Sequence, residues 1–199
     1  MEKLTDNKYE IHDLLKRRWS PRAFSNKEIE TDKFLRILEA ARWAPSAFNE
    51  QPWIYFLGFN NDTTYKKIFE SLTASNQTWA FSAPVLMVCC SKKLYSIGKE
   101  NKYLGYDAGQ SVAHMTFQAM QEGIFIHQMA GFSIEKVIEN FKLPDQYTPF
   151  TVIAIGYIGN PDSLPNDLKE RELAVRTRKN LNDFIFQDEF GSTHEIVKP

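Results

Sequence analysis

The sequence has few cysteines and no excess of charge of either sign. Its two cysteines, Cys89 and Cys90, are adjacent inside an apolar run, a spacing that suits neither a disulfide framework nor a CxxC metal site. We expect both to be reduced strand residues in a cytoplasmic protein. The formal net charge of −1 argues against binding to nucleic acid or to a membrane surface through bulk charge, so we expect neither as a partner.

Long apolar runs and nucleotide-binding motifs are also missing. No run approaches the length of a membrane span, and residues 1–6 lack the apolar core of a signal peptide. Neither GxGxxG nor a P-loop motif occurs, which removes support for the common nucleotide sites. None of the four histidines has a partner at metal-ligand spacing, and Ser20 and Ser46 lie outside a GxSxG motif. We therefore predict no metal site and no serine hydrolase.

Positive charge is concentrated in the segment 17–24 (RRWSPRAF), which places three arginines around a serine and a proline. Pro21 ends the preceding helical pattern, because the residue before a proline is pushed out of the α region. Guanidinium groups form paired hydrogen bonds to phosphate and stay charged at any working pH. An isolated arginine pair is more often a solvated basic corner, so this segment alone leaves both interpretations open.

A second arginine group, Arg176 and Arg178, lies near the end of the chain, with amide-rich loops and aromatic residues between the two groups. A phosphate monoester carries nearly two negative charges, so a single arginine would leave it under-compensated in a cleft. The combined set suits a ligand with a phosphate at one end and a flat, hydrogen-bonding ring at the other. From the residues alone we predict binding of a flavin or of a nucleotide monophosphate.

Helical and strand periodicities alternate along the chain, which predicts one α+β domain over residues 1–199 with a polar tail over 191–199. Helices are predicted over 9–16, from Thr31 as N-cap to Pro45, over 63–71, over 104–122 and from Ser133 as N-cap. Strands are predicted over 53–59, 85–90, 124–127, 151–158 and 184–186. The segment 160–169, which contains two prolines, is predicted as a loop.

Two motifs near the N-terminus, 18–24 (RWSPRAF) and 41–53 (ARWAPSAFNEQPW), resemble signatures of the nitroreductase-like flavoprotein family. Matching pieces follow in the order of that family: Asn76 ahead of 82–85 (SAPV), then 107–109 (DAG), 130–132 (AGF) and 176–178 (RTR). The ordered set covers nearly the whole chain and is more specific than either motif alone.

The resemblance implies a three-layer sandwich, in which a central mixed, mainly antiparallel sheet is flanked by helices and a C-terminal arm extends to the partner subunit of a homodimer. Phe184 and Phe186 would lie on this arm, whereas without the resemblance we would expect them to close the core of their own chain. The small residues of helix 104–122 would form the contact at the two-fold axis, namely Ala108, Gly109, Ala113 and Ala119.

The implied activity is that of an FMN-dependent oxidoreductase, which passes electrons from NADH or NADPH to a nitroaromatic, a quinone or a similar small acceptor by a ping-pong mechanism. A specialised reductase of the same family, such as a dehalogenase or an enal or semialdehyde reductase, is one alternative. A flavin-binding carrier or sensor with little turnover is the alternative from a different class.

The resemblance also assigns the site. Arg18 and Ser20 match positions that hold the FMN phosphate and ribityl chain together with the two C-terminal arginines, and Trp19 matches a backbone contact. Arg22 matches the basic position near the N1/C2 edge of the ring. Arg22 and Gly131 are the expected catalytic positions. The full set of expected cofactor-binding residues is Arg18, Trp19, Ser20, Arg22, Pro45, Ser46, Ala47, Asn49, Asn76, Ala130, Gly131, Arg176 and Arg178.

The remaining matches fall on loops. The segment 45–49 matches the loop along the ring, and its first three residues would reach over from the partner subunit. Asn76 matches a hydrogen-bonding position at the flavin edge, and the 130–131 turn matches the backbone N–H that faces flavin N5. Two departures from the family bear on the redox tuning of the flavin: Trp79 stands where well-known members place a lysine, and Ala130 stands where some carry an acidic residue.

Overall fold

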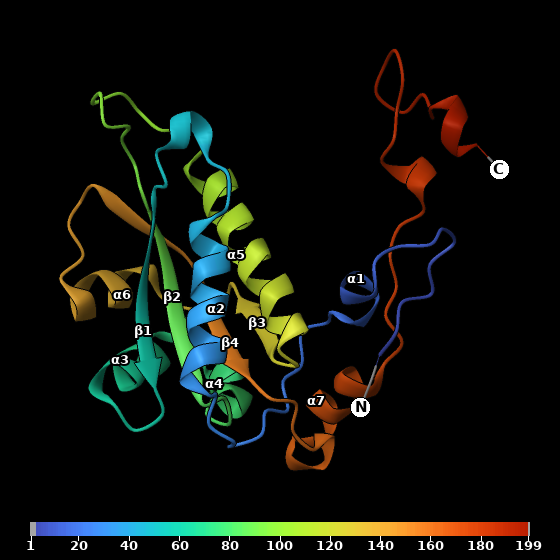
Figure 1. Cartoon of the computed structure of the whole chain (residues 1–199). Helices are drawn as coiled ribbons and strands as arrows, with labels where there is room; N and C mark the ends of the chain where they lie inside the picture. Colours follow the sequence, from blue (N-terminus) through green and yellow to red (C-terminus); the bar gives the residue numbers. More distant parts are fainter. Residues whose placement is uncertain (1–2, 199) are drawn as a thin grey trace.

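A four-stranded sheet organises the part of the chain that the structure, a computed structural model, describes, residues 3–198 (Figure 1). Its strands are β1 (Trp53–Phe59), β2 (Val85–Lys92), β3 (Phe125–Met129) and β4 (Tyr147–Gly156), in the spatial order β1-β2-β4-β3. All three pairings are antiparallel, so the mixed character that we allowed for is not found in this sheet. The expected α+β class, the positions of four of the five predicted strands and the central place of β4 are confirmed.

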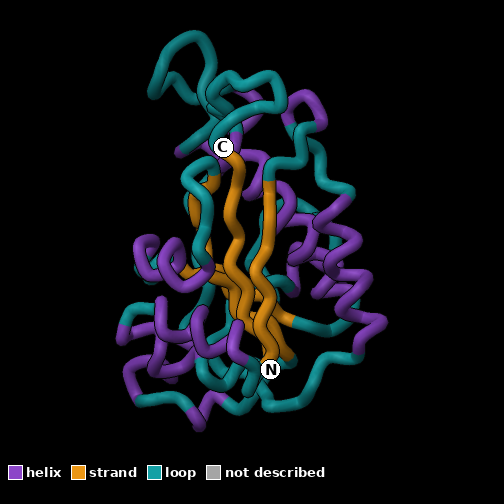
Figure 2. Tube along the Cα trace, turned by 90° about the vertical axis from the view of Figure 1, so that its left-hand side faces the viewer, coloured by secondary structure: helices purple, strands orange, loops and turns teal. Residues whose placement is uncertain are grey.

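Helices cover both faces of the sheet, which gives three layers (Figure 2). The helices are α1 (Asp13–Arg17), α2 (Thr31–Arg42), α3 (Thr63–Ser71), α4 (Ala74–Ala80), α5 (Leu104–Gln121), α6 (Ile134–Phe141) and α7 (Asn166–Leu173). Two buried clusters lie on opposite faces, one with α2 and α5 and the other with α3, α4 and α6. Both faces of β2 are therefore shielded from solvent, and residues 85–91 of this strand are buried. No helix within residues 3–198 is long and apolar enough to cross a membrane.

The adjacent cysteines show how β2 divides the core. Successive strand residues point to opposite faces, so Cys89 packs with the α2–α5 cluster and Cys90 with the other cluster. Both thiols are free and buried, and desolvation raises the pKa of each to about 12. They are protonated and inert at neutral pH, which confirms the expectation of reduced strand residues.

Four local predictions were wrong. The helix predicted over 9–16 begins only at Asp13. Thr31 is the first residue of α2, and Glu30 occupies the N-cap position without a side-chain cap bond. The segment 160–169 is not a loop, because the short 3-10 helix Pro161–Ser163 and then α7 begin there. Prolines that we interpreted as breakers stand at helix starts, where their missing N–H costs nothing. The segment 184–186 forms no strand but only a single bridge, Phe186 to Thr193.

The C-terminal segment 174–198 leaves α7 and extends beside α1, away from the sheet (Figure 1). Phe184 and Phe190 are 52% and 94% exposed, and Phe190 packs edge-on against Phe186 at 5.2 Å between ring centroids. These rings do not close the core of their own chain, which contradicts the alternative that we considered. The predicted polar tail contains the 3-10 helix Glu195–Val197, and its last residue, Pro199, lies outside the described residues.

The small residues of α5 divide between two uses. Ala108 and Ala119 are buried in the core beneath α2, and the hydroxyl of Ser111 donates to the Ala41 carbonyl of α2 at 3.0 Å. They let α2 approach, so assigning them to an intersubunit contact was wrong. Gly109 is exposed, and a Cβ built there meets nothing within 4 Å. Only Gly109 and the half-buried Ala113 remain available for a second helix.

Candidate functional site

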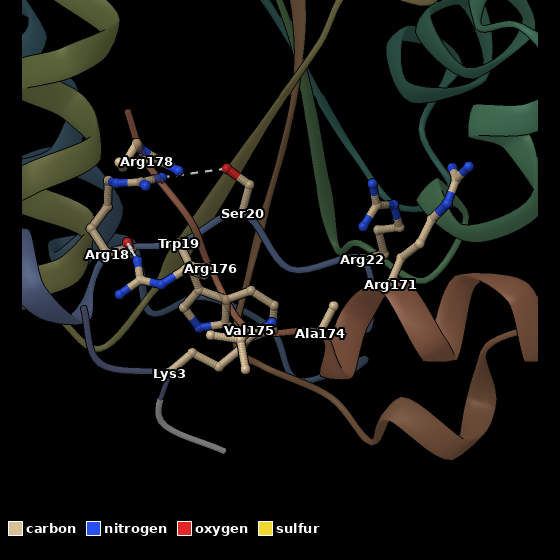
Figure 3. Close-up of a pocket in the computed structure, with 10 residues that line it drawn as sticks. All are labelled: Lys3, Arg18, Trp19, Ser20, Arg22, Arg171, Ala174, Val175, Arg176 and Arg178. Atoms are coloured by element: carbon tan, nitrogen blue, oxygen red, sulfur yellow. Dashed lines mark hydrogen bonds between the residues drawn. The ribbon is translucent and has the colours of Figure 1, made fainter. Parts of the chain in front are cut away.

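One pocket of about 240 Å³, which we call the arginine pocket, gathers most of the charge singled out in the sequence (Figure 3). It lies between the segment 18–22 and the chain that follows α7. Five arginines and one lysine line it, so the two arginine groups, more than 150 residues apart in sequence, meet as predicted. The lining residues are Lys3, Arg18, Trp19, Ser20, Arg22, Arg171, Ala174, Val175, Arg176 and Arg178.

A buried glutamate of α7 fixes one side of this pocket. The side chain of Glu172 is 0% exposed, and its carboxylate accepts the backbone N–H of Arg22 at 2.9 Å and that of Ala23 at 3.1 Å. The same carboxylate lies 3.9 Å from the Arg22 guanidinium. Sequence analysis missed Glu172, because an acidic residue in a polar helix gives no sign that it is buried.

Arg176 has a more structural role than we predicted. Its guanidinium donates to the carbonyl of Lys16 at 2.6 Å and to the carbonyl of Arg18, two acceptors at the C-terminal end of α1 that no N–H of the helix reaches. Arg176 therefore attaches the C-terminal segment to α1. The Arg176 Nε–H and the Trp19 indole N–H are buried without a hydrogen-bond partner among the described residues. The pocket therefore contains two donors whose hydrogen bonds no described residue satisfies.

Burial and repulsion between arginines lower the pKa of two cations of the pocket, Arg18 and Arg176. Burial lowers the pKa of Arg18, and the nearby Arg178 lowers it further. Burial likewise lowers the pKa of Arg176, with added repulsion from the same two arginines. Glu172 is the only acidic residue in contact with this cluster within residues 3–198, and its oxygens are occupied by the loop. A cluster of cations with leftover donors is the chemistry that binds a phosphate monoester.

The other side of the arginine loop (residues 18–24) rests on an imidazole. His127 of β3 lies 2.8 Å from the Pro21 carbonyl through Nδ1, and its ring lies 4.5 Å from the ring of Trp79. Burial lowers the pKa of His127 to about 4, so the imidazole is neutral and its proton is on Nδ1, since a carbonyl only accepts. His127 is thus a buried histidine whose Nδ1–H is satisfied by a backbone carbonyl.

Trp79 is a core residue that supports the arginine loop. It is 2% exposed and stacks on Phe24 with 6.3 Å between ring centroids, besides its contact with His127. Its indole therefore fills the space beneath the loop and is not presented at the surface of a ligand site. Trp79 would therefore affect a bound cofactor only by positioning the arginine loop.

Asn76 and Gly131, which the resemblance assigns separately to the flavin site, are in direct contact. The Asn76 side chain donates to the Gly131 carbonyl at 2.9 Å, and the Thr73 N–H donates to the same oxygen at 3.0 Å. A Cβ on Gly131 would lie 2.7 Å from Asn76 Nδ2 and 2.8 Å from Thr73 Oγ1. A side chain at position 131 would therefore displace the Asn76 amide and the Thr73 hydroxyl, a packing reason for glycine that the resemblance did not supply. Ala130 beside it is exposed.

The predicted loop 45–49 lies at the other end of α2 from the arginine loop (Figure 1). Arg22 precedes this helix and Pro45 follows it, and 12 helical residues span about 18 Å. Within one chain, Pro45, Ser46, Ala47 and Asn49 therefore do not join the arginine pocket. Pro45 and Asn49 line a separate cavity of about 360 Å³ together with Arg42, Trp43, Ala44 and Gln51.

This loop is held in a strained shape. Phe48, Asn49 and Gln51 have φ values of 54°, 57° and 47°, a left-handed conformation that costs non-glycine residues about 1–3 kcal/mol each. The buried carboxylate of Asp107 accepts the Ala47 N–H at 3.2 Å, and burial raises the pKa of Asp107. Sequence analysis noted the motif around Asp107 but missed this anchoring role.

Comparisons with known proteins identify the family to which this chain is similar. The model of the nitroreductase family matches residues 15–76, which contain the arginine loop, the strained loop and Asn76. A solved structure described as an oxidoreductase containing FMN superposes with a TM-score of 0.88 at 32% identity, over 94% of this chain and 96% of that one.

Curated relatives carry related names. A Methanothermobacter thermautotrophicus protein, named provisionally as an NADH dehydrogenase/NAD(P)H nitroreductase, is 27% identical over 156 residues, 76% of this chain and 78% of that protein. An oxygen-insensitive NADPH nitroreductase of Helicobacter pylori is 37% identical over 81 residues, 40% of this chain and 38% of that protein.

The neutral state of His127 predicts a pH dependence of stability. In the folded chain the pKa of His127 is about 4, whereas in the unfolded chain, where the imidazole is exposed, it is about 6.5. Between these two pH values the unfolded chain therefore binds more protons than the folded chain. The contribution of His127 is fully present above pH 6.5 and is lost as the pH falls toward 4. We expect about 2 kcal/mol of the free energy of unfolding to be lost on this account between pH 7 and pH 5.

Urea titrations at several pH values measure this loss. His127→Gln should lack that part of the pH slope, whereas His114→Gln, at an exposed position of α5, should keep the slope of the parent chain. Identical slopes for His127→Gln and the parent would contradict the neutral, buried assignment.

Proposed function

This chain belongs to the nitroreductase family, and from that premise we propose that it is an FMN-dependent oxidoreductase that uses NADH or NADPH as electron donor. The observation that carries the proposal is the arginine pocket, which is lined by five arginines and one lysine and by no acidic residue among the described residues. Relatives named as FMN-containing or NAD(P)H-dependent oxidoreductases support the choice among phosphorylated ligands.

The residues of the pocket fit the phosphate end of FMN. Arg18 and Arg178 offer guanidinium groups, and Ser20 lies beside Arg18 with 3.4 Å between its hydroxyl and the guanidinium. Arg176, which lines the same pocket, adds its unsatisfied Nε–H as a further donor. A dianionic phosphate would relieve the repulsion that now lowers the pKa of Arg18 and Arg176. We assign these residues to the phosphate and ribityl chain.

When bound, FMN supplies a ring that takes up a hydride from the donor and passes electrons to an acceptor. Arg22, whose loop is fixed by Glu172, would place a cation beside the edge of the ring where negative charge develops on reduction. The N–H of Gly131, which donates to no other described residue, would offer a hydrogen bond at the opposite edge. Trp19 contributes through its backbone, and Asn76 orients the turn that carries Ala130 and Gly131.

We further propose that the site is completed by a second copy of this chain. The strained loop with Pro45, Ser46 and Ala47 lies one helix length from the arginine pocket of its own chain. In a two-fold dimer the loop of each subunit would reach the pocket of the other, as the family resemblance implies. The exposed aromatic residues of the C-terminal arm would then be covered by the partner.

The acceptor in this proposal is a small nitroaromatic or quinone, taken up after the donor has left the same face of the ring. A ping-pong order follows, because the two substrates would occupy one place in succession. A dehalogenase or an enal or semialdehyde reductase would use the same pocket with a different acceptor. A carrier or sensor would bind FMN without turnover.

Anaerobic spectrophotometry tests the proposed activity. The purified protein should carry FMN, NADH or NADPH should bleach its absorbance near 450 nm, and an added quinone or nitroaromatic should restore it. Initial rates at several fixed acceptor concentrations should give parallel double-reciprocal lines. A flavin that stays oxidised with both donors would point to the carrier, and intersecting lines would refute the shared binding face.

Assembly is tested at Gly109, the open small residue of α5. Gly109→Gln should leave the fold of the chain intact, because nothing lies within 4 Å of the new side chain's first carbon. It should obstruct a close helix contact, so light scattering should report a smaller dimer fraction and FMN should bind more weakly. Lys66→Gln, an exposed change on α3 across the sheet, serves as the control. A monomeric Gly109→Gln protein that binds FMN as tightly as the parent would refute the shared site.

A further inference from the structure

The arginine pocket has two cationic ends. Figure 3 shows Arg18 and Arg178 at one end with Ser20, and Arg22 and Arg171 at the other. The first end suits the cofactor phosphate. The second end has two guanidinium groups where the resemblance accounts for only one of them, Arg22. Arg171 is the cation of the pocket whose presence the proposed FMN site does not explain.

No neighbouring acid compensates Arg171. Within residues 3–198, it makes no ion pair and donates no side-chain hydrogen bond, although it directly precedes Glu172 in α7. The Glu172 carboxylate is turned into the loop, where it accepts backbone N–H groups and faces Arg22. Lys3 is not a competing cation at this end, because its ammonium donates to the Glu172 carbonyl at 2.7 Å and lies 4.7 Å from the Trp19 ring.

The charge of the cofactor does not require this second guanidinium. The oxidised isoalloxazine ring is uncharged, and its phosphate lies at the opposite end in the proposed FMN site. Arg22 is paired with the Glu172 carboxylate at 3.9 Å, whereas Arg171 lines the same cavity without an ion pair among the described residues, so its charge is available to an anion that enters the cavity. We propose that Arg171, together with Arg22, forms a subsite for an oxyanion, a phosphate monoester or a carboxylate, carried by the electron donor or by the acceptor.

This inference rests on the proposed function and adds to it that one of the two substrates carries an anionic group. The oxyanion has two possible sources, the 2′-phosphate that distinguishes NADPH from NADH or a carboxylate on the electron acceptor. Because Arg171 is exposed, we expect an effect of about tenfold on affinity, smaller than for a buried pair.

Calorimetric titration of the oxidised, FMN-loaded protein tests the subsite without turnover. Two matched ligand pairs distinguish the sources, NADP⁺ against NAD⁺ and 4-nitrobenzoate against its methyl ester. Arg171→Ala should weaken the more anionic member of one pair about tenfold and leave its counterpart unchanged. Loss confined to NADP⁺ assigns the subsite to the donor, and loss confined to 4-nitrobenzoate assigns it to the acceptor. Unchanged affinity ratios in both pairs would overturn the proposal.

Two further comparisons separate this subsite from other roles. Lys169→Ala removes a cation from the same helix, where Lys169 pairs with Asp162 at 2.6 Å outside the pocket, and it should change neither ratio. The FMN dissociation constant should be the same in Arg171→Ala and the parent. If Arg171→Ala weakens FMN as strongly as Arg18→Ala does, Arg171 belongs to the cofactor site and the proposal is wrong. Because these are binding measurements, a protein without turnover would refute the proposed activity and leave this test intact.

Discussion

The buried carboxylate of Glu172 is the interaction on which the arginine pocket depends. It accepts the N–H groups of Arg22 and Ala23, while His127 holds the Pro21 carbonyl from the other side. The loop is thus fixed through its backbone, and its arginine side chains are free to face the pocket. An acceptor is needed there because an apolar residue would leave the buried Ala23 N–H without a partner, and a carboxylate can accept both N–H groups at once. The same residue joins α7, and with it the C-terminal segment, to the start of the chain.

Much of this arrangement could be predicted from the sequence. The strands and α3 follow from their apolar periodicity, and the meeting of two distant arginine groups follows from the charge needed to bind a phosphate. The residues that position the site could not be predicted. Glu172 and Asp107 act through burial, which tertiary packing alone determines, and neither stands out from the many other acids of the chain. For the same reason, Trp79 gave no sign that it would be a support of the loop.

Two strategies of preorganisation meet in this chain. The arginine loop is fixed by buried polar groups, whereas the loop at the far end of α2 is fixed in a strained conformation by Asp107 and by Glu50, whose carboxylate accepts the Ser96 N–H at 3.0 Å. Strain of this kind persists only where the surrounding structure imposes it. A loop held so firmly, yet far from the pocket of its own chain, supports a site assembled from two subunits.

The central claim is that the arginine pocket recognises the phosphate of FMN, and a thermodynamic cycle tests it most directly. FMN and riboflavin, which lacks the phosphate, are each titrated into the parent protein and into Arg18→Ala. We predict that the parent binds FMN far more tightly than riboflavin. Arg18→Ala should weaken FMN by roughly one to two decades, the value of a charge-assisted hydrogen bond, and leave riboflavin affinity unchanged. Equal losses for both ligands, or equal affinities of the parent for both, would contradict the account.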